Sequence, residues 1–112
     1  MKEQPNLYEG MFVIAANLSD DQRRQSVEKI KNMITQSGGE IVKEHDMGRR
    51  RLAYEIKRHK EGYYTLLYFN LEPSAMKNLW KEWRLMEELL RFLTLRTDDV
   101  LEKLEFKALA EQ

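Results

Sequence analysis

The sequence predicts an α+β domain with the element order β-α-β-β-α-β, and three observations lead to this fold class. The chain has 112 residues, the size of one domain, and 42% of them are hydrophobic, which supplies one core. Two segments repeat apolar residues at helical spacing. Four others are rich in the aromatic and β-branched residues typical of strands. In this order the strands form a four-stranded antiparallel sheet with two helices on one face.

The first strand and first helix are predicted from residue types and capping signals. Leu7–Ile14 mixes aromatic and β-branched residues with aliphatic ones, which favours a strand. Ser19 and Gln22 have the spacing of a capping box, so a helix is expected to begin there. Gly38-Gly39 permits the positive φ that ends a helix. The apolar stripe between these signals consists of Val27, Ile30 and Ile34.

A pair of antiparallel strands is expected in the middle of the chain. Glu40–Lys57 is predicted as one long kinked strand or as two strands, with a turn or bulge at Met47-Gly48. The charged segment Arg58–Gly62 is expected to form the hairpin loop. Tyr63–Leu71 follows as a strand with apolar residues on both faces.

The last two elements complete a ferredoxin-like arrangement. Pro73 is expected to open the second helix, and Leu89–Leu95 reads as the last strand. The helix carries an apolar arc, in which the two tryptophans are expected to be core residues. Its members are Met76, Leu79, Trp80, Trp83 and Met86. We therefore expect one domain over residues 1–96 and a tail over residues 97–112, which is either frayed or a short helix capped by Asp98 or Asp99.

Composition and motifs argue against several function classes. Nineteen Lys and Arg residues balance nineteen Asp and Glu residues, so any contact with nucleic acid must be a local patch. The chain has no cysteine, and His45 and His59 lack the spacing of metal ligands. No phosphate-cradling or nucleophile motif occurs, so neither an enzyme nor a cofactor, metal or small-molecule substrate is expected. The apolar runs are too short for a membrane span and the start of the chain resembles no targeting peptide, which predicts a soluble, cytoplasmic protein.

Basic residues are concentrated in one segment, and this is the strongest functional signal. Six basic residues lie between Arg49 and Lys60, opposed there only by Glu55. Consecutive residues of a strand alternate between faces, so Arg49, Arg50 and Arg51 cannot all point the same way. Guanidinium groups bind phosphate through two-point contacts, which favours RNA as a ligand. The same pattern also fits a solvated strand whose charges oppose aggregation at a sheet edge.

Two other functions on this fold remain as alternatives. Glu61–Tyr68 occupies the place of the octapeptide with which an RNA-recognition motif stacks bases. It keeps the glycine and two aromatic residues but has Thr65 at the central aromatic position, which weakens the case for such a single-stranded RNA-binding module. An acylphosphatase-like enzyme would need a phosphate-cradling loop, and the sequence shows none.

The strand over Tyr63–Leu71 predicts a second apolar surface. Two helices cover only one face of a sheet, so Tyr64, Leu66 and Tyr68 are expected on the face left uncovered. An exposed apolar patch often marks a site for a partner protein. Alternatively, the C-terminal tail folds back over this face.

Several local strings resemble the bacterial small-subunit ribosomal protein six family, from about Leu7 to Arg96. The most specific string is Gly48–Ile56, which reads GRRRLAYEI and is followed by KEGYY over Lys60–Tyr64. The other matching strings are Tyr8-Glu9, Gly38-Gly39-Glu40-Ile41 and Leu89-Leu90-Arg91-Phe92. The chain departs from the family pattern at Glu55, where proline is usual, and in the bulk of Trp80 and Trp83.

The resemblance implies a structural component of the small ribosomal subunit. Such a protein binds the central domain of the 16S ribosomal RNA together with small-subunit protein eighteen, as a heterodimer. The positions of Arg50 and Arg51 in the family motif imply that these two residues contact RNA. Arg49 is included because it adjoins them, and the resemblance gives Arg84 and Arg91 as weaker candidates. Tyr64, Leu66 and Tyr68 are the corresponding candidates for the face that meets the partner protein.

Overall fold

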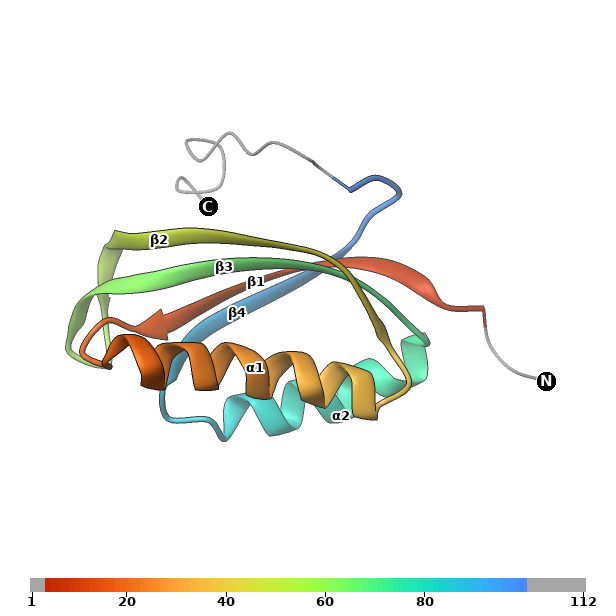
Figure 1. The fold of residues 1–112 in the computed structure, drawn as a ribbon, viewed down its shortest axis with the longest axis horizontal. Helices are drawn as coiled ribbons and strands as arrows, with labels where there is room; N and C mark the ends of the chain where they lie inside the picture. The colour runs from red at the N-terminus through yellow and green to blue at the C-terminus, as the bar shows by residue number, and fades with distance from the viewer. Residues whose placement is uncertain (1–3, 101–112) are drawn as a thin grey trace.

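The computed structural model describes residues 4–100, which form one sheet with two helices on one of its faces (Figure 1). The elements are β1 (Asn6–Ala15), α1 (Asp20–Gln36), β2 (Glu40–Ile56), β3 (His59–Leu71), α2 (Pro73–Arg84) and β4 (Leu89–Arg96). The strand order is β2-β3-β1-β4, and every neighbouring pair is antiparallel. The predicted fold class is confirmed.

The capping box predicted at the start of α1 is present. The Ser19 hydroxyl accepts a hydrogen bond from the backbone N–H of Gln22 at 3.2 Å. In return, the backbone N–H of Ser19 donates to Oε1 of Gln22 at 3.0 Å. Both contacts satisfy amide groups that have no partner inside the helix. Gly38, at a φ of 90°, turns the chain out of the helix as its sequence position predicts.

The helix-covered face holds the main core. Trp83 on α2 is fully buried, and its ring meets the rings of Phe12 and Phe92 edge-on, with centroids 4.9 and 5.4 Å away. The core expectation is confirmed for Trp83. Trp80 is only half-buried, and its indole N–H donates to the hydroxyl of Thr94 on β4 at 2.9 Å. Other buried members of this core are Ile14, Val27, Ile30, Ile34, Leu67, Phe69, Leu71, Met76 and Leu79.

β2 is one continuous strand with bulges, which confirms the first of the two predicted forms. Its register against β3 shifts between Ile41 and Lys43, between Asp46 and Gly48, and a third time between Arg51 and Ile56. At the second bulge Gly48 has a φ of 77°, a conformation that glycine adopts without steric cost, and its N–H donates to the Asp46 carboxylate at 3.0 Å. The bulge expected at Met47-Gly48 is therefore confirmed.

The β2–β3 turn is shorter than predicted. Only Lys57 and Arg58 lie outside the strands, whereas His59–Gly62 belong to β3. The predicted loop over Arg58–Gly62 is wrong because the strands pair again at the tip, where Ile56 faces His59 after the irregular stretch that follows Arg51. Lys57 and Arg58 have φ values of 49° and 68°, and positive φ at both central residues is the mark of a type I′ turn.

The end of the described chain runs along the face opposite the helices. β4 ends at Arg96, where the N–H of Thr97 still donates to the backbone carbonyl of Leu7 at 2.9 Å. Val100 packs against the apolar cluster on that face. The short helix or frayed tail predicted after Asp98 and Asp99 lies almost entirely outside the described residues. Within residues 4–100, no helix is long and apolar enough to cross a membrane.

Candidate nucleic-acid interface

The three consecutive arginines of β2 project to both faces of the sheet. Arg49 and Arg51 lie on the side of the helices, where they border the same groove. Arg50 points the other way, and its Nε donates to the carbonyl oxygen of Met47 at 3.2 Å. Leu52, two residues after Arg50, is buried on that same opposite face. The alternation predicted for the arginine triplet is thus confirmed.

Arg49 is already paired within the molecule. Its Nε donates to Oε2 of Glu61 on the neighbouring strand at 2.6 Å. This hydrogen bond, together with the negative charge of Glu61, raises the pKa of Arg49 above its ordinary value. Much of the guanidinium charge is therefore compensated locally, which weakens Arg49 as a group that attracts phosphate.

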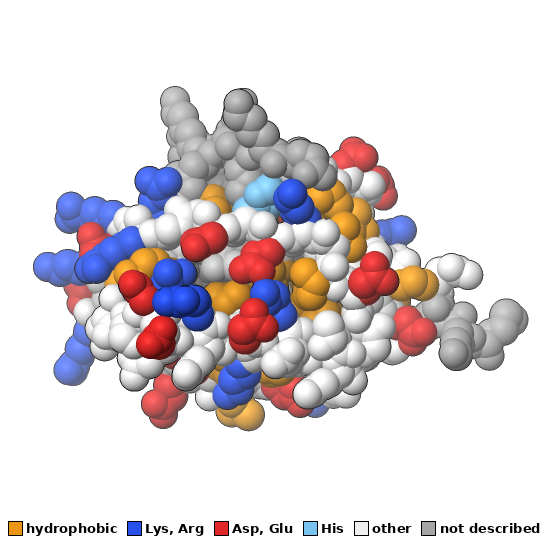
Figure 2. Space-filling model, viewed as in Figure 1, with side chains coloured by type: hydrophobic (Ala, Val, Ile, Leu, Met, Phe, Trp, Pro, Cys, Tyr) orange, Lys and Arg blue, Asp and Glu red, His pale blue; other side chains and the backbone are white. Residues whose placement is uncertain are grey.

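A polar groove of about 500 Å³ lies between the β1–α1 loop and the β2–β3 hairpin. Four cationic side chains border it, against a single carboxylate. The residues that line the groove are Ala16, Asn17, Arg49, Arg51, Arg58, His59, Lys60 and Glu61. In Figure 2, Lys and Arg side chains gather at the left end of the molecule, where Figure 1 shows this hairpin. The sequence places Arg58 and Lys60 in a basic segment, but sequence reasoning did not include them among the site residues.

Arg91 belongs to a second basic position, on the face opposite the helices. It lies on β4 and pairs with Val13 of β1. Its Nη1 donates to the hydroxyl of Tyr54 at 2.9 Å, and its guanidinium carbon lies 5.8 Å from the centre of the Tyr54 ring. Tyr54 is 61% exposed, so this pair offers both a cation and an aromatic face to solvent.

Arg84 stands apart from the other candidates. It is exposed at the last turn of α2, where a cation is favoured by the helix dipole. The structure therefore divides the five candidates among three places. Arg49 and Arg51 border one groove, Arg50 and Arg91 lie on the sheet face opposite the helices, and Arg84 lies on α2.

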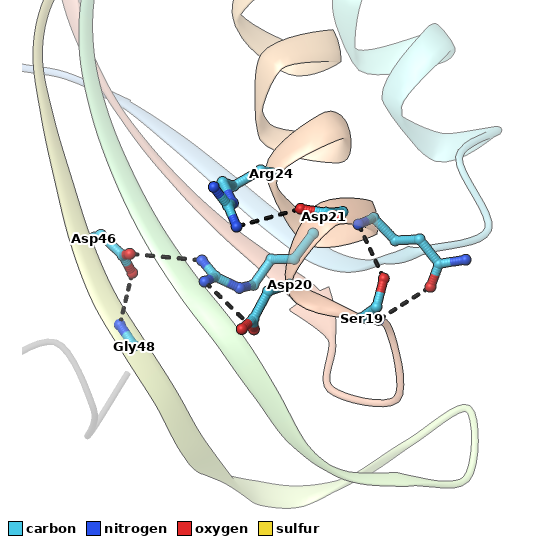
Figure 3. A network of polar contacts seen from close by, with 8 residues as sticks. Ser19, Asp20, Asp21, Arg24, Asp46 and Gly48 are labelled. Atoms are coloured by element: carbon cyan, nitrogen blue, oxygen red, sulfur yellow. Dashed lines mark hydrogen bonds and ion pairs between the residues drawn. The ribbon is translucent and has the colours of Figure 1, made fainter.

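One basic residue, Arg23 of α1, makes contacts inside the molecule and has a structural role. Its guanidinium lies 4.5 Å above the centre of the Tyr63 ring, and its side chain is only 17% exposed. It reaches the carboxylates of Asp46 and Asp20 at 3.5 and 3.9 Å, which Figure 3 shows on β2 and at the start of α1. Arg23 therefore fastens α1 to the sheet.

The predicted partner face is less open than expected. Leu66 and Tyr68 expose no surface, and the Tyr68 hydroxyl donates to the Glu9 carboxylate at 2.8 Å. Tyr64 is half-buried. The expected exposure of Leu66 and Tyr68 is wrong because β1, β2 and the end of the described chain contribute covering side chains. These are Leu7, Met11, Met47 and Val100.

The same geometry argues against base stacking of the RNA-recognition type. Tyr63 lies on the helix-covered face beneath Arg23, and Tyr68 is buried on the other face. Thr65 is also buried. A stacking platform needs exposed aromatic faces on an open sheet, so this strand cannot supply one. Among residues 4–100, no group of three or more His, Asp or Glu residues is placed to hold a metal ion.

Comparison with known proteins agrees with the fold. The family model described as ribosomal protein S6 matches residues 7–96. Small ribosomal subunit protein bS6 of Protochlamydia amoebophila is 60% identical over 107 residues, which cover 96% of this chain and 94% of that protein. Its counterpart in Chlamydia abortus is 53% identical over 99% of this chain and 100% of its own. The crystal structure of 30S ribosomal protein S6 from Thermotoga maritima superimposes with a TM-score of 0.79 at 37% identity, covering 84% of this chain and 89% of that one.

The ferredoxin-like fold and these matches define the chain as a ribosomal protein of the small subunit. The match covers almost every described residue and includes the arginine triplet of β2. The chain belongs to the ribosomal protein S6 family. Members of this family are structural components of the ribosome and not enzymes, which confirms the non-enzymatic expectation and places the chain in the cytoplasmic ribosome.

Proposed function

We propose that the chain binds the central domain of the 16S ribosomal RNA together with small-subunit protein eighteen, as a heterodimer. The observation that carries this proposal is the local concentration of exposed cations on an otherwise neutral chain. A neutral protein is not attracted to RNA as a whole, so its affinity must come from such a patch and from a partner. In this proposal, the residues that contact RNA and those that contact protein eighteen all belong to the domain over residues 1–96.

In this proposal, phosphate contact is made chiefly by Arg50 and Arg51, which project to opposite faces near the hairpin. Both are exposed, and the Nε of Arg50 donates to the backbone carbonyl oxygen of Met47. Arg91 and Arg84 add cations on β4 and α2, and Arg49 contributes least because Glu61 compensates its charge. Phosphate contacts position a protein on a folded RNA surface without reading bases.

The partner protein is proposed to contact the sheet face opposite the helices. Tyr64 is half-buried there, and Leu93 and Leu95 on the edge strand β4 are 43% and 47% exposed. Leu66 and Tyr68 are buried in the apolar cluster on the same face of the sheet, beneath the exposed side chains. A second protein bound at this face would add its own RNA contacts, and linking the two sets raises affinity without a change in either.

Binding measurements with and without protein eighteen test this proposal. The chain alone is expected to bind a central-domain RNA fragment weakly, and the affinity is expected to rise strongly when protein eighteen is added. Arg50→Ala together with Arg51→Ala should reduce the salt dependence of binding by about two units of slope, if each side chain meets one phosphate. An unchanged slope would remove both residues from the interface, and absence of the chain from purified small subunits would contradict the proposal itself.

A further inference from the structure

The turn between β2 and β3 combines an unfavourable backbone with an exposed cation. Lys57 and Arg58 both adopt the left-handed conformation, with φ values of 49° and 68°. Side chains with a Cβ atom are sterically disfavoured there, and type I′ turns usually contain Asn-Gly instead. Backbone strain of this kind is found where a functional arrangement requires it. A two-residue hairpin turn requires this conformation, so what is unusual here is that two long cationic residues adopt it.

The groove beside this turn contains cations that form no ion pair within the part of the chain that the structure describes. Arg51, Arg58 and Lys60 form no ion pair with any residue in the described range 4–100, whereas Arg49 is paired with Glu61. Lys57, the other residue of the turn, does not line the groove. The strained turn thus directs one of its two cations, Arg58, toward the groove and leaves the other outside it.

The lining chemistry indicates the class of ligand. Apart from the imidazole of His59, the described lining has no aromatic ring on which a base would stack, and it has no large apolar side chain. Two guanidinium groups and an ammonium group suit an anion with several oxygen atoms, since guanidinium binds phosphate through two parallel hydrogen bonds. Consecutive phosphates of a nucleic-acid backbone match a groove with cations on both strands of a hairpin.

We propose that Arg51, Arg58 and Lys60 form a phosphate-binding groove that holds the backbone of a ribosomal RNA strand. The left-handed turn at Lys57-Arg58 places Arg58 in this groove. The inference rests on the proposed function for the identity of the RNA, and it adds the hairpin tip to the interface.

Two single substitutions in the same turn test the groove. Arg58→Gly and Lys57→Gly each remove one positive charge and each relieve one left-handed residue, but only Arg58 borders the groove. Both variants should raise the midpoint of thermal unfolding by about 2–4 °C, because relief of the strain exceeds the entropic cost of glycine. Only Arg58→Gly should weaken RNA binding, by about tenfold, and lower the salt slope by about 0.9.

The measurement is a salt series of binding to a central-domain fragment of 16S RNA with protein eighteen present. An unrelated RNA hairpin of equal length is measured in parallel. Arg51→Gln should reproduce the loss of slope without a rise in the unfolding midpoint, whereas Lys77→Gln on the exposed side of α2 should leave the slope unchanged.

The outcomes separate the groove from the proposed function. Two results would overturn the proposed phosphate-binding groove without contradicting ribosomal RNA binding. One is an equal salt slope of RNA binding for Arg58→Gly and the unaltered chain. The other is an equal decrease in that slope for Arg58→Gly and Lys57→Gly. Equal affinity of the unaltered chain for both RNAs would contradict the proposed function. In that case the slopes measured on either RNA still decide whether the groove binds phosphate.

Discussion

The helix-covered face of the sheet and the opposite face are made from the same four strands, yet they bury apolar side chains in different ways. On the helix-covered face, one continuous core joins all four strands to both helices around Trp83. On the opposite face, two smaller clusters form, one around Leu52 and one around Leu66 and Tyr68. The first face therefore carries most of the stability, while the second leaves Tyr54, Leu93 and Leu95 exposed for contact.

The largest expected effect is on the helix-covered face. Trp83→Ala should lower the free energy of unfolding by about 3–5 kcal/mol, because it leaves a cavity where Phe12 and Phe92 pack. Urea denaturation measures this loss. Trp83→Phe should cost less than half as much, since it keeps most of the volume and removes an indole N–H that has no hydrogen-bond partner among residues 4–100. A larger loss for Phe than for Ala would contradict this account of the core.

A smaller loss is expected on the opposite face. Leu52→Ala should cost about 2–3 kcal/mol, because its cluster contains few other fully buried side chains and relaxes more readily around the cavity. Leu85→Ala, at a side chain that is 82% exposed, is the matched control and should change stability by less than about 0.5 kcal/mol. If Leu52→Ala destabilised the protein as much as Trp83→Ala, the contrast between the two faces would fail.

The smallest effect concerns pH. Burial raises the pKa of Tyr64 above its ordinary value, and the nearby positive charge of Arg91 opposes this shift in part. The folded state therefore holds the Tyr64 proton more tightly than the unfolded state, so stability falls as the pH rises above about 10. Tyr64→Phe should reduce this fall, as measured by urea denaturation at pH 8 and at higher pH.

Local signals in the sequence were sufficient for most of the fold. The cap at Ser19 and the stop at Gly38 depend on residues close together in the chain, and both were predicted correctly. The β2–β3 turn was predicted wrongly because Lys57-Arg58 carries no Asn or Gly to mark a tight turn. A turn held against local preference cannot be recognised from residue types alone.

The candidate site was only partly predictable, for a different reason. Period-two alternation correctly divides the arginine triplet between two faces. It does not reveal that Glu61 compensates Arg49, since that contact depends on the register of two strands. Nor does alternation show that Leu66 and Tyr68 are covered, because the covering residues Leu7 and Val100 come from the two ends of the described chain.

The bulge in β2 before Gly48 also determines which arginines share a surface. Because side chains alternate along a strand, the one extra residue at this bulge reverses the facing of the positions that follow it as far as the next irregularity, after Arg51. With regular pairing instead, Arg50 would join the helix layer, and Leu52 would leave its apolar cluster. The number of residues between Asp46 and Arg49 thus determines which side chains of β2 face the helices. A deletion of one residue there would exchange the side chains on the helix-covered face with those on the opposite face.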